Sequence, residues 1–333
     1  FPPEKMGTAQ GIYAGWGNFG SAFAAFFLPL VALLFSEETG WRVATSLSGF
    51  ACLIWAGLYY RCCPDAAEKD RSFLVDLHGV IEVTSRRDLA LQIMLLLPVY
   101  GAISLFIWKL SRQPFSLISN SFFIALILGL VFLFLLNAMR CWKTNYPRIQ
   151  YPISKENKYE FSQIAILSLV YSLTFGSELA VVSMFPQFLE TTFSISVSLA
   201  GMLGASYAFM NLVARPGGGW ISDRFGRRRT LFIMVFGGMV SHWLMSEIDS
   251  SWQLTSAITL AIVGSIFLKA GNGACFAVIP LIYKPITGKL AGMAGAYGSV
   301  GAVCFLTLFS FITPQVFFKV ISAYAFLVFL CLF

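Results

Sequence analysis

Charge is scarce in this sequence. Only 12% of the 333 residues are Asp, Glu, Lys or Arg, which is about half of the share in soluble domains. Hydrophobic residues make up 57%, and the mean hydropathy is +0.75. A chain of this composition would be insoluble in water. A soluble globular domain is therefore excluded, and a multi-span integral membrane protein is predicted.

The patterns of metal sites, disulfide frameworks and enzymes are also missing. The seven cysteines are scattered, and the adjacent Cys62 and Cys63 cannot hold a metal alone. The sequence shows no nucleophile–base pair, metal cluster or nucleotide-binding loop. We therefore expect no metal, no cofactor and no enzymatic activity. The net charge of +7 does not indicate a nucleic-acid partner, because positive residues gather in loops on one side of a membrane.

Ten segments reach the roughly 20 apolar residues that a membrane-spanning helix needs. They cover residues 8–35, 41–60, 89–108, 116–139, 163–186, 196–221, 230–246, 254–281, 288–312 and 314–333. With the N-terminus in the cytoplasm, most lysines and arginines fall in inside regions, and the outside loops hold only Arg42, Lys109 and Arg112. This bias favours that orientation.

Two interpretations stay open for the segments 89–108 and 116–139. Pro98 interrupts the first segment, and the basic residues Lys109 and Arg112 between the two lie on the predicted outside. The pair either spans the membrane or forms re-entrant or surface-lying segments in a long central loop. Later helices keep their orientation in both cases, because the pair adds two spans or none.

A glycine-rich stretch at the start of the first span recurs near the end of the chain. A constant offset of 281 places Gly7 on Gly288, Gly11 on Gly292, Trp16 on Tyr297, Gly17 on Gly298, Asn18 on Ser299 and Gly20 on Gly301. Glycines let a neighbouring helix or a small ligand approach the backbone within a membrane. We interpret the stretch as an internal repeat that relates two halves of a transporter.

Three ionisable residues lie at membrane depth: Glu178, Arg215 and Lys269. Each costs about 3 kcal/mol at the bilayer centre on insertion scales, so we expect them to face a cavity or one another. Arg215 precedes the loop at Asp223 by eight residues, which places it roughly 12 Å into the membrane. Transporter substrate sites lie near the midplane, between the repeats.

The loop after that helix resembles the G-x-x-x-D-R-x-G-R-R motif of the major facilitator superfamily. The matching positions are Gly219, Asp223, Arg224, Gly226 and Arg227, followed by Arg228. A plain basic cytoplasmic turn is the alternative interpretation. The resemblance implies that these residues form a gating motif between helices eight and nine of a twelve-helix fold.

Other segments resemble the nitrate/nitrite porter family of that superfamily. The two glycine-rich stretches are similar to its nitrate-signature helices five and eleven, and further matches are Tyr171-Ser-Leu-Thr-Phe175-Gly-Ser-Glu178, Asn211-Leu-Val-Ala-Arg215-Pro and Ile286-Thr-Gly288-Lys. The sequence departs from the family pattern in two ways. The first four helices of the family are missing, and with them the arginine that partners the helix-eight arginine on nitrate. Ser299 also stands where the family usually has asparagine. The start at Phe1 and the end within a hydrophobic run also predict a fragment.

The resemblance implies an all-α integral membrane protein, a major facilitator superfamily helical bundle with two repeat-related halves whose N-terminal part is missing. Residues 1–61 would end the N-terminal half with helices 5 and 6. Residues 62–160 would form a central cytoplasmic loop with two extra hydrophobic segments. Residues 161–333 would form the C-terminal half with helices 7 to 12.

Arg215 is the predicted main ligand of nitrate, because a planar guanidinium donates to two oxygens at once and lysine does not. The predicted substrate site also contains Asn18, Gly17, Tyr171, Phe175, Gly298 and Ser299. Tyr171 and Phe175, one helical turn apart, would sandwich the planar ion. The alternatives are an arginine that reaches the cytoplasmic surface, a helix–helix hydrogen bond for Asn18, and simple packing for the aromatic pair.

The predicted function is secondary active transport of nitrate or nitrite by alternating access, with proton coupling favoured. Glu178 and Lys269 are the candidate coupling residues, and a structural ion pair is the alternative for them. A nitrate/nitrite exchanger, a carrier of another small anion and a nitrate-binding membrane receptor remain as other functions. The expected location is the plasma (cell inner) membrane, with lipid, the anion and protons as partners.

Overall fold

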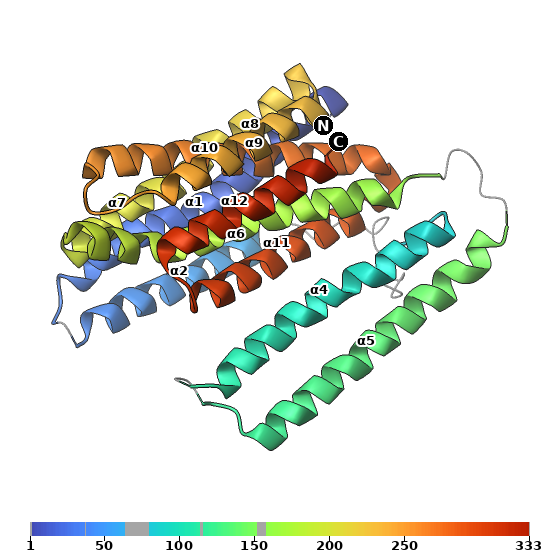
Figure 1. The fold of residues 1–333 in the computed structure, drawn as a ribbon, viewed down its shortest axis with the longest axis horizontal. Coiled ribbons are helices and arrows are strands. Elements are labelled where there is room, and N and C mark those ends of the chain that lie inside the picture. Colours follow the sequence, from blue (N-terminus) through green and yellow to red (C-terminus); the bar gives the residue numbers. More distant parts are fainter. Residues whose placement is uncertain (1, 37, 64–79, 114–115, 152–157, 333) are drawn as a thin grey trace.

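The computed structural model describes residues 2–36, 38–63, 80–113, 116–151 and 158–332, and these form helices and their connections (Figure 1). The helices are α1 (Met6–Ala32), α2 (Gly40–Cys62), α4 (Arg86–Ser111), α5 (Asn120–Ile149), α6 (Phe161–Phe193), α7 (Val197–Phe209), α8 (Asn211–Phe225), α9 (Arg227–Met245), α10 (Leu254–Ile282), α11 (Thr287–Phe309) and α12 (Pro314–Cys331). Short 3₁₀ turns, η1 (Pro3–Lys5) and η3 (Lys284–Ile286), precede α1 and α11. Much of the predicted central loop, at 64–79 and 152–157, lies outside the described residues.

Within the described residues, nine helical segments are long and apolar enough to cross a membrane, with α7 and α8 counted as one segment, Val197–Phe225. The remaining predicted span, 230–246, corresponds to the 19-residue helix α9. This helix is not one of the nine segments. Its first turn holds three arginines, and glycine, serine and histidine follow, so its hydropathy is lower. Because α9 packs against α10 and α12, its polar positions Ser241 and His242 are buried.

The helices α4 and α5 form an antiparallel pair beside the rest of the bundle (Figure 1). Both are unbroken over 26 and 30 residues, and Pro98 lies inside α4 without ending it. The described residues therefore form two full-length helices rather than re-entrant halves. The inner helix α4 packs against α6 and α11, where the Tyr297 hydroxyl donates to the carbonyl of Leu95.

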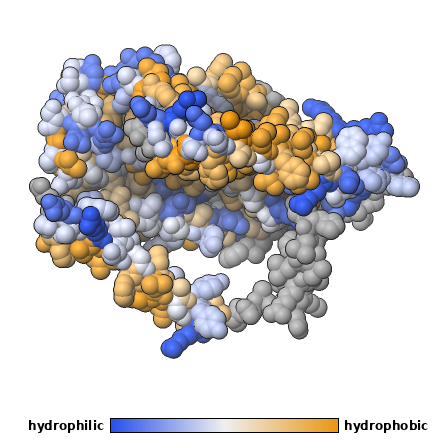
Figure 2. All heavy atoms as spheres, turned by 90° about the horizontal axis from the view of Figure 1, so that it is seen from below, coloured by the Kyte–Doolittle hydropathy of each residue, from blue (hydrophilic) through white to orange (hydrophobic). Residues whose placement is uncertain are grey.

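Hydrophobic residues cover much of the middle of the molecule, and hydrophilic residues gather toward the ends of its long axis (Figure 2). Many large hydrophobic side chains of the described residues are exposed, among them Phe50, Leu53 and Leu128. Since a bilayer core is about 30 Å thick and a helix rises about 1.5 Å per residue, helices of this length and composition fit a membrane. The chain is a multi-pass membrane protein.

The repeat seen in the sequence is also present in the secondary structure. The turn η1 and helix α1 start at residues 3 and 6, and η3 and α11 start 281 positions later, at residues 284 and 287. Their glycines, however, make different contacts. In α1, Gly11 and Gly15 meet α8, whereas in α11 Gly298 and Gly301 meet α6. A Cβ at Gly17, Gly20, Gly288 or Gly292 would have no described atom within 4 Å.

The close contact of α1 with α8 leads to a stability prediction. A Cβ at Gly11 would lie 2.7 Å from the carbonyl oxygen of Arg215 and 2.8 Å from Cα of Pro216. We expect Gly11→Ala to destabilise the protein by about 1–3 kcal/mol, because overpacking outweighs the better helix propensity of alanine. Thermal unfolding in detergent measures this, and Gly20→Ala on the same helix is the matched control. Equal melting temperatures for the two variants would contradict the prediction.

Candidate functional site

Arg215 is the centre of the candidate site. It lies on α8, five residues after the break at Met210 that separates this helix from α7, and its side chain is only 2% exposed. Its Nη2 donates a 2.6 Å hydrogen bond to the hydroxyl of Tyr171. Its Nε and Nη1 have no hydrogen-bond partner among the described residues. A buried guanidinium with free donors is suited to bind an anion.

Tyr171 and Phe175 form an aromatic wall next to Arg215. Their rings are parallel within 5°, with centroids 5.0 Å apart, and the guanidinium carbon of Arg215 lies 5.6 Å from the Phe175 centroid. An ion between two rings needs them about 7 Å apart, twice the usual carbon contact distance. The predicted sandwich is therefore wrong for this structure. Rings four residues apart share a helix face and stack on each other.

Helix α1 lines the other side of an open pocket of about 620 Å³. Gly17 and Asn18 line it together with Tyr171, Phe175, Arg215 and Phe276. The Asn18 amide donates to the carbonyl of Ala14 in its own helix, at 2.8 Å, and a second amide hydrogen is left for a ligand. The structure thus brings five of the seven predicted substrate residues to one pocket.

Gly298 supports this pocket from behind. A Cβ at this position would lie 2.7 Å from the Phe175 ring and 2.8 Å from the Tyr171 ring, so only glycine lets both rings lie against α11. Ser299 is exposed and does not line the pocket. The reason is helix geometry, because consecutive residues point about 100° apart. Ser299, a predicted substrate-site residue, therefore lies outside the pocket that Asn18 lines in the described structure.

Glu178 on α6 and Lys269 on α10 lie in a buried polar cluster next to α8, the helix that carries Arg215. The two carboxylate oxygens of Glu178 accept hydrogen bonds from the amides of Asn211, at 2.6 Å, and Asn272, at 2.7 Å. Lys269 Nζ lies 3.5 Å from Glu178 Oε1 and 4.2 Å from the ring centroid of Tyr207. The two residues therefore pair with each other, as the structural alternative expected. Asn211 precedes Arg215 by one helical turn, so this cluster is next to the anion site.

The predicted gating motif joins α8 to the start of α1. Asp223 accepts from the backbone N–H groups of Gly7 and Thr8, at 3.1 and 2.9 Å, and forms an ion pair with Arg227 at 3.3 Å. The carboxylate thus caps the N-terminus of α1, where the helix dipole is positive. Gly219 lets the backbone of Gly7 come close.

Two further motif residues shape the turn itself. Gly226 has a φ of +101° between α8 and α9, a backbone conformation that favours glycine. The guanidinium of Arg224 lies 5.5 Å from the ring centroid of Trp220. The loop therefore combines a sharp turn with a charged contact to α1, which belongs to the other predicted half.

We expect Asp223→Asn to slow transport without abolishing nitrate binding. The amide keeps one acceptor oxygen but loses the charge that stabilises the N-terminus of α1 and pairs with Arg227, a loss of about 1 kcal/mol or more. Initial uptake rates in proteoliposomes should fall several-fold, with a smaller change in KM. Glu190→Gln, at a position without a described hydrogen bond, is the control. A KM effect larger than the rate effect would contradict a gating role.

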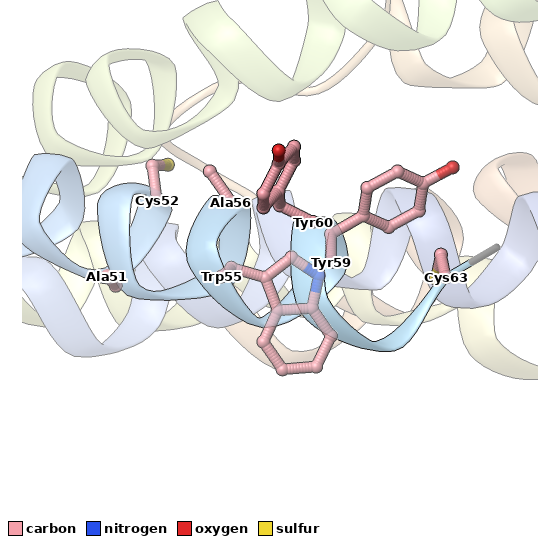
Figure 3. A pocket seen from close by; sticks show the side chains of 7 residues that line it. All are labelled: Ala51, Cys52, Trp55, Ala56, Tyr59, Tyr60 and Cys63. Carbon is pink, nitrogen blue, oxygen red and sulfur yellow. The ribbon is translucent and has the colours of Figure 1, made fainter. Parts of the chain in front are cut away.

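A hollow larger than the Arg215 pocket lies away from this site. It has a volume of about 940 Å³ and is lined by six residues of α2, among them Trp55, Tyr59 and Tyr60, and by Cys63 at the end of that helix (Figure 3). The lining has no charged residue, so it offers no positive charge to an anion. The smaller pocket beside Arg215 is the candidate site on chemical grounds.

Several residues of the site were missed in the sequence. Phe276 packs edge-on against Tyr171, with ring centroids 4.8 Å apart, and Asn211, Asn272 and Tyr207 surround the Glu178–Lys269 pair. A periodicity signal was available for two of them. Asn211 precedes Arg215 by four residues and Asn272 follows Lys269 by three, so each shares a helix face with a predicted residue.

Comparison with known proteins agrees with this geometry. The profile of the Major Facilitator Superfamily matches residues 167–333. The nitrate/nitrite transporter NrtP of Picosynechococcus sp. is 39% identical over 94% of this chain and 63% of its own length. The NrtP of Nostoc punctiforme is 36% identical over 100% of this chain and 68% of its own length. The high affinity nitrate transporter 2.5 of Arabidopsis thaliana is 35% identical over 96% of this chain.

The chain thus spans about two thirds of the length of the NrtP relatives and 51% of the Arabidopsis protein. These relatives are named as transporters, in agreement with a chain that is not an enzyme. The superfamily match covers the helices that carry Tyr171, Arg215 and the gating motif. The chain belongs to the major facilitator superfamily, and within it to the nitrate/nitrite porter family.

Proposed function

We propose that this chain is part of a secondary active transporter that moves nitrate or nitrite across the plasma membrane. The observation that carries the proposal is the buried guanidinium of Arg215, which has two unpartnered nitrogens and lies at an aromatic pocket. A buried cation attracts a small anion strongly, because the low dielectric constant strengthens their interaction. Nitrate is planar, and a planar guanidinium can donate to two of its oxygens.

The surrounding residues select for such an ion. The Tyr171 hydroxyl holds one end of the guanidinium, so the side chain is oriented before the anion arrives. Phe175 and Phe276 make the wall apolar. The Asn18 amide, on the opposite helix α1, supplies a neutral donor from the other predicted half. A flat, weakly hydrated anion fits this combination of one charged fork, one amide and aromatic faces.

Alternating access is supported by the contact between α1 and the gating motif. Asp223 holds the N-terminus of α1 at one end of the bundle, and the anion pocket lies between the same helices further along. Release of this contact would let the two halves separate on that side. The pocket would then open alternately to the two sides of the membrane.

Proton coupling is the form of energy coupling that we propose. Entry of an anion against an inside-negative potential costs about 2.3 kcal/mol per 100 mV, so uptake needs a co-transported cation or an exchanged anion. The buried pair of Glu178 and Lys269 is the proposed coupling element, because both residues ionise and both lie beside the helix of Arg215. Exchange of nitrate for nitrite is the alternative, and it is electroneutral.

The deciding experiment is nitrate flux through the full-length protein in proteoliposomes. We expect labelled nitrate to accumulate when the outside is made more acidic, and liposomes without protein serve as the control. Flux that occurs only in the presence of internal nitrite would show that the protein is an exchanger and not a symporter. Nitrate binding without any flux would show that it is a receptor and not a transporter.

A further inference from the structure

We propose that Lys269, and not Glu178, is the residue of the coupling pair that takes up and releases the proton, while Glu178 stays an ionised carboxylate. This inference rests on the proposed proton-coupled transport and identifies its proton site. It starts from the different hydrogen bonding of the two buried side chains.

The carboxylate of Glu178 is already satisfied without lysine. It is 2% exposed, and each of its oxygens accepts a short hydrogen bond from an asparagine amide, at 2.6 Å from Asn211 and 2.7 Å from Asn272. Amide groups of this kind donate to the ionised form. A proton on Glu178 would remove the negative charge to which both amides donate, and so would weaken both hydrogen bonds. Protonation of Glu178 therefore destabilises the cluster.

The amine of Lys269 is held far less firmly. The residue is fully buried, its Nζ is 3.5 Å from Glu178 Oε1, and this atom has no hydrogen-bond partner among the described residues. An ammonium group has three donors to satisfy, and here it meets one distant oxygen and the ring face of Tyr207 at 4.2 Å. Loss of a proton from Lys269 breaks no hydrogen bond and leaves both amide bonds to Glu178 in place.

The charges around Lys269 link its proton to the anion. Arg215, on the adjacent helix α8, repels the ammonium. An anion bound to Arg215 cancels this repulsion, so nitrate binding favours the protonated form of Lys269. By linkage, the protonated form binds nitrate more tightly. Proton and nitrate therefore enter and leave together.

The other titratable groups that interact with Lys269 fit this assignment. They are Glu178 on α6, Tyr207 on α7, Arg215 on α8 and His242 on α9. Helix α1 has no charged residue between Met6 and Ala32, and Lys289 lies in the first turn of α11. His242 already contacts the carbonyl of Gly238 in its own helix through Nδ1, and it does not contact the Glu178 cluster. It is the natural control.

The stoichiometry follows from the chemistry. Neutral Lys269 takes one proton from the outside as nitrate binds to Arg215, and both are released on the inside, where the amine becomes neutral again. One positive and one negative charge move together. Uptake coupled through this residue alone is electroneutral, so it follows the pH gradient and does not respond to the membrane potential.

The test is calorimetry of nitrate binding to the full-length protein in detergent, in buffers of different ionisation enthalpy. We expect uptake of about one proton per nitrate by the wild type. Lys269→Arg, which keeps the charge but does not release a proton, should bind nitrate without proton uptake, and the neutral Lys269→Met variant should show none either. Glu178→Gln and His242→Gln should keep the uptake.

Three results would overturn the assignment. One is continued proton uptake on nitrate binding to Lys269→Arg, and a second is loss of this uptake in Glu178→Gln with its retention in Lys269→Met. Wild-type protein that binds nitrate without proton uptake at any pH would also overturn it. By contrast, absence of nitrate binding to the wild type would overturn the proposed function itself. In proteoliposomes, Lys269→Arg should exchange nitrate but fail to accumulate it under a pH gradient.

Discussion

Replacement of Arg215 by lysine is expected to abolish high-affinity nitrate uptake while the protein still reaches the membrane. The positive charge remains, but the planar fork that can donate to two nitrate oxygens is lost. The hydrogen bond to Tyr171 also loses its geometry, so the charge is no longer held against the pocket. Loss of one or two charge-assisted hydrogen bonds costs about 2–4 kcal/mol, which is a roughly 30- to 1000-fold weaker affinity.

Radiotracer uptake at increasing nitrate concentration measures this effect, with membrane amounts compared by immunoblot. Arg42→Lys is the matched control, because Arg42 is exposed near the start of α2 and should give wild-type kinetics. An Arg215→Lys variant with the apparent affinity of the wild type would show that Arg215 does not hold the ion.

Substitution of Gly298 should have the second-largest effect. A Cβ on Gly298 would come within 2.7 Å of the Phe175 ring and 2.8 Å of the Tyr171 ring, closer than real carbon atoms approach. The rings are stacked on each other, so they can only move together, into the pocket or away from Arg215. We expect Gly298→Ala to reduce nitrate transport by about 10-fold or more, a perturbation of about 1–3 kcal/mol, and Gly298→Leu to abolish it.

Gly292→Ala, on the same helix, is the control for this prediction. A Cβ there would have no described atom within 4 Å, so transport by this variant should stay close to wild type. Leucine at Gly17 should also block transport, but for another reason. Gly17 lines the pocket and has free space around its Cα, so the larger side chain would occupy the volume of the anion. Normal transport by both Gly298→Leu and Gly17→Leu would show that neither glycine is needed at the substrate site.

Sequence patterns were most reliable where the reason is local. Hydrophobic length predicted the helices, because a span must bury its backbone polar groups within a continuous helix. The offset of 281 predicted that α1 and α11 correspond, and both start after a 3₁₀ turn at equivalent positions. The sharp turn at Gly226 also depends on a few neighbouring residues, and its motif was identified in the sequence through the resemblance to the major facilitator superfamily.

Local patterns did not predict how the glycines and aromatic rings are used. Gly17 and Gly298 occupy equivalent repeat positions, yet the first lines an open pocket and the second lies against two rings. The pair Tyr171 and Phe175 was placed on one helix face correctly, but its stacking depends on α11 behind it. Such contacts involve residues more than 100 positions apart, and no short window of sequence holds both partners.

By itself, the sequence determined that this protein is a helical membrane protein with Arg215 as a costly buried charge, because composition, span length and residue chemistry are properties of the chain alone. Only the tertiary structure decided which groups meet that charge. It placed Tyr171 on Arg215, Gly298 behind the rings, Ser299 away from the pocket and two asparagines on Glu178. The physical reason is that hydrogen bonds and close packing act over about 3–4 Å, a distance set by how helices cross and not by their spacing along the chain.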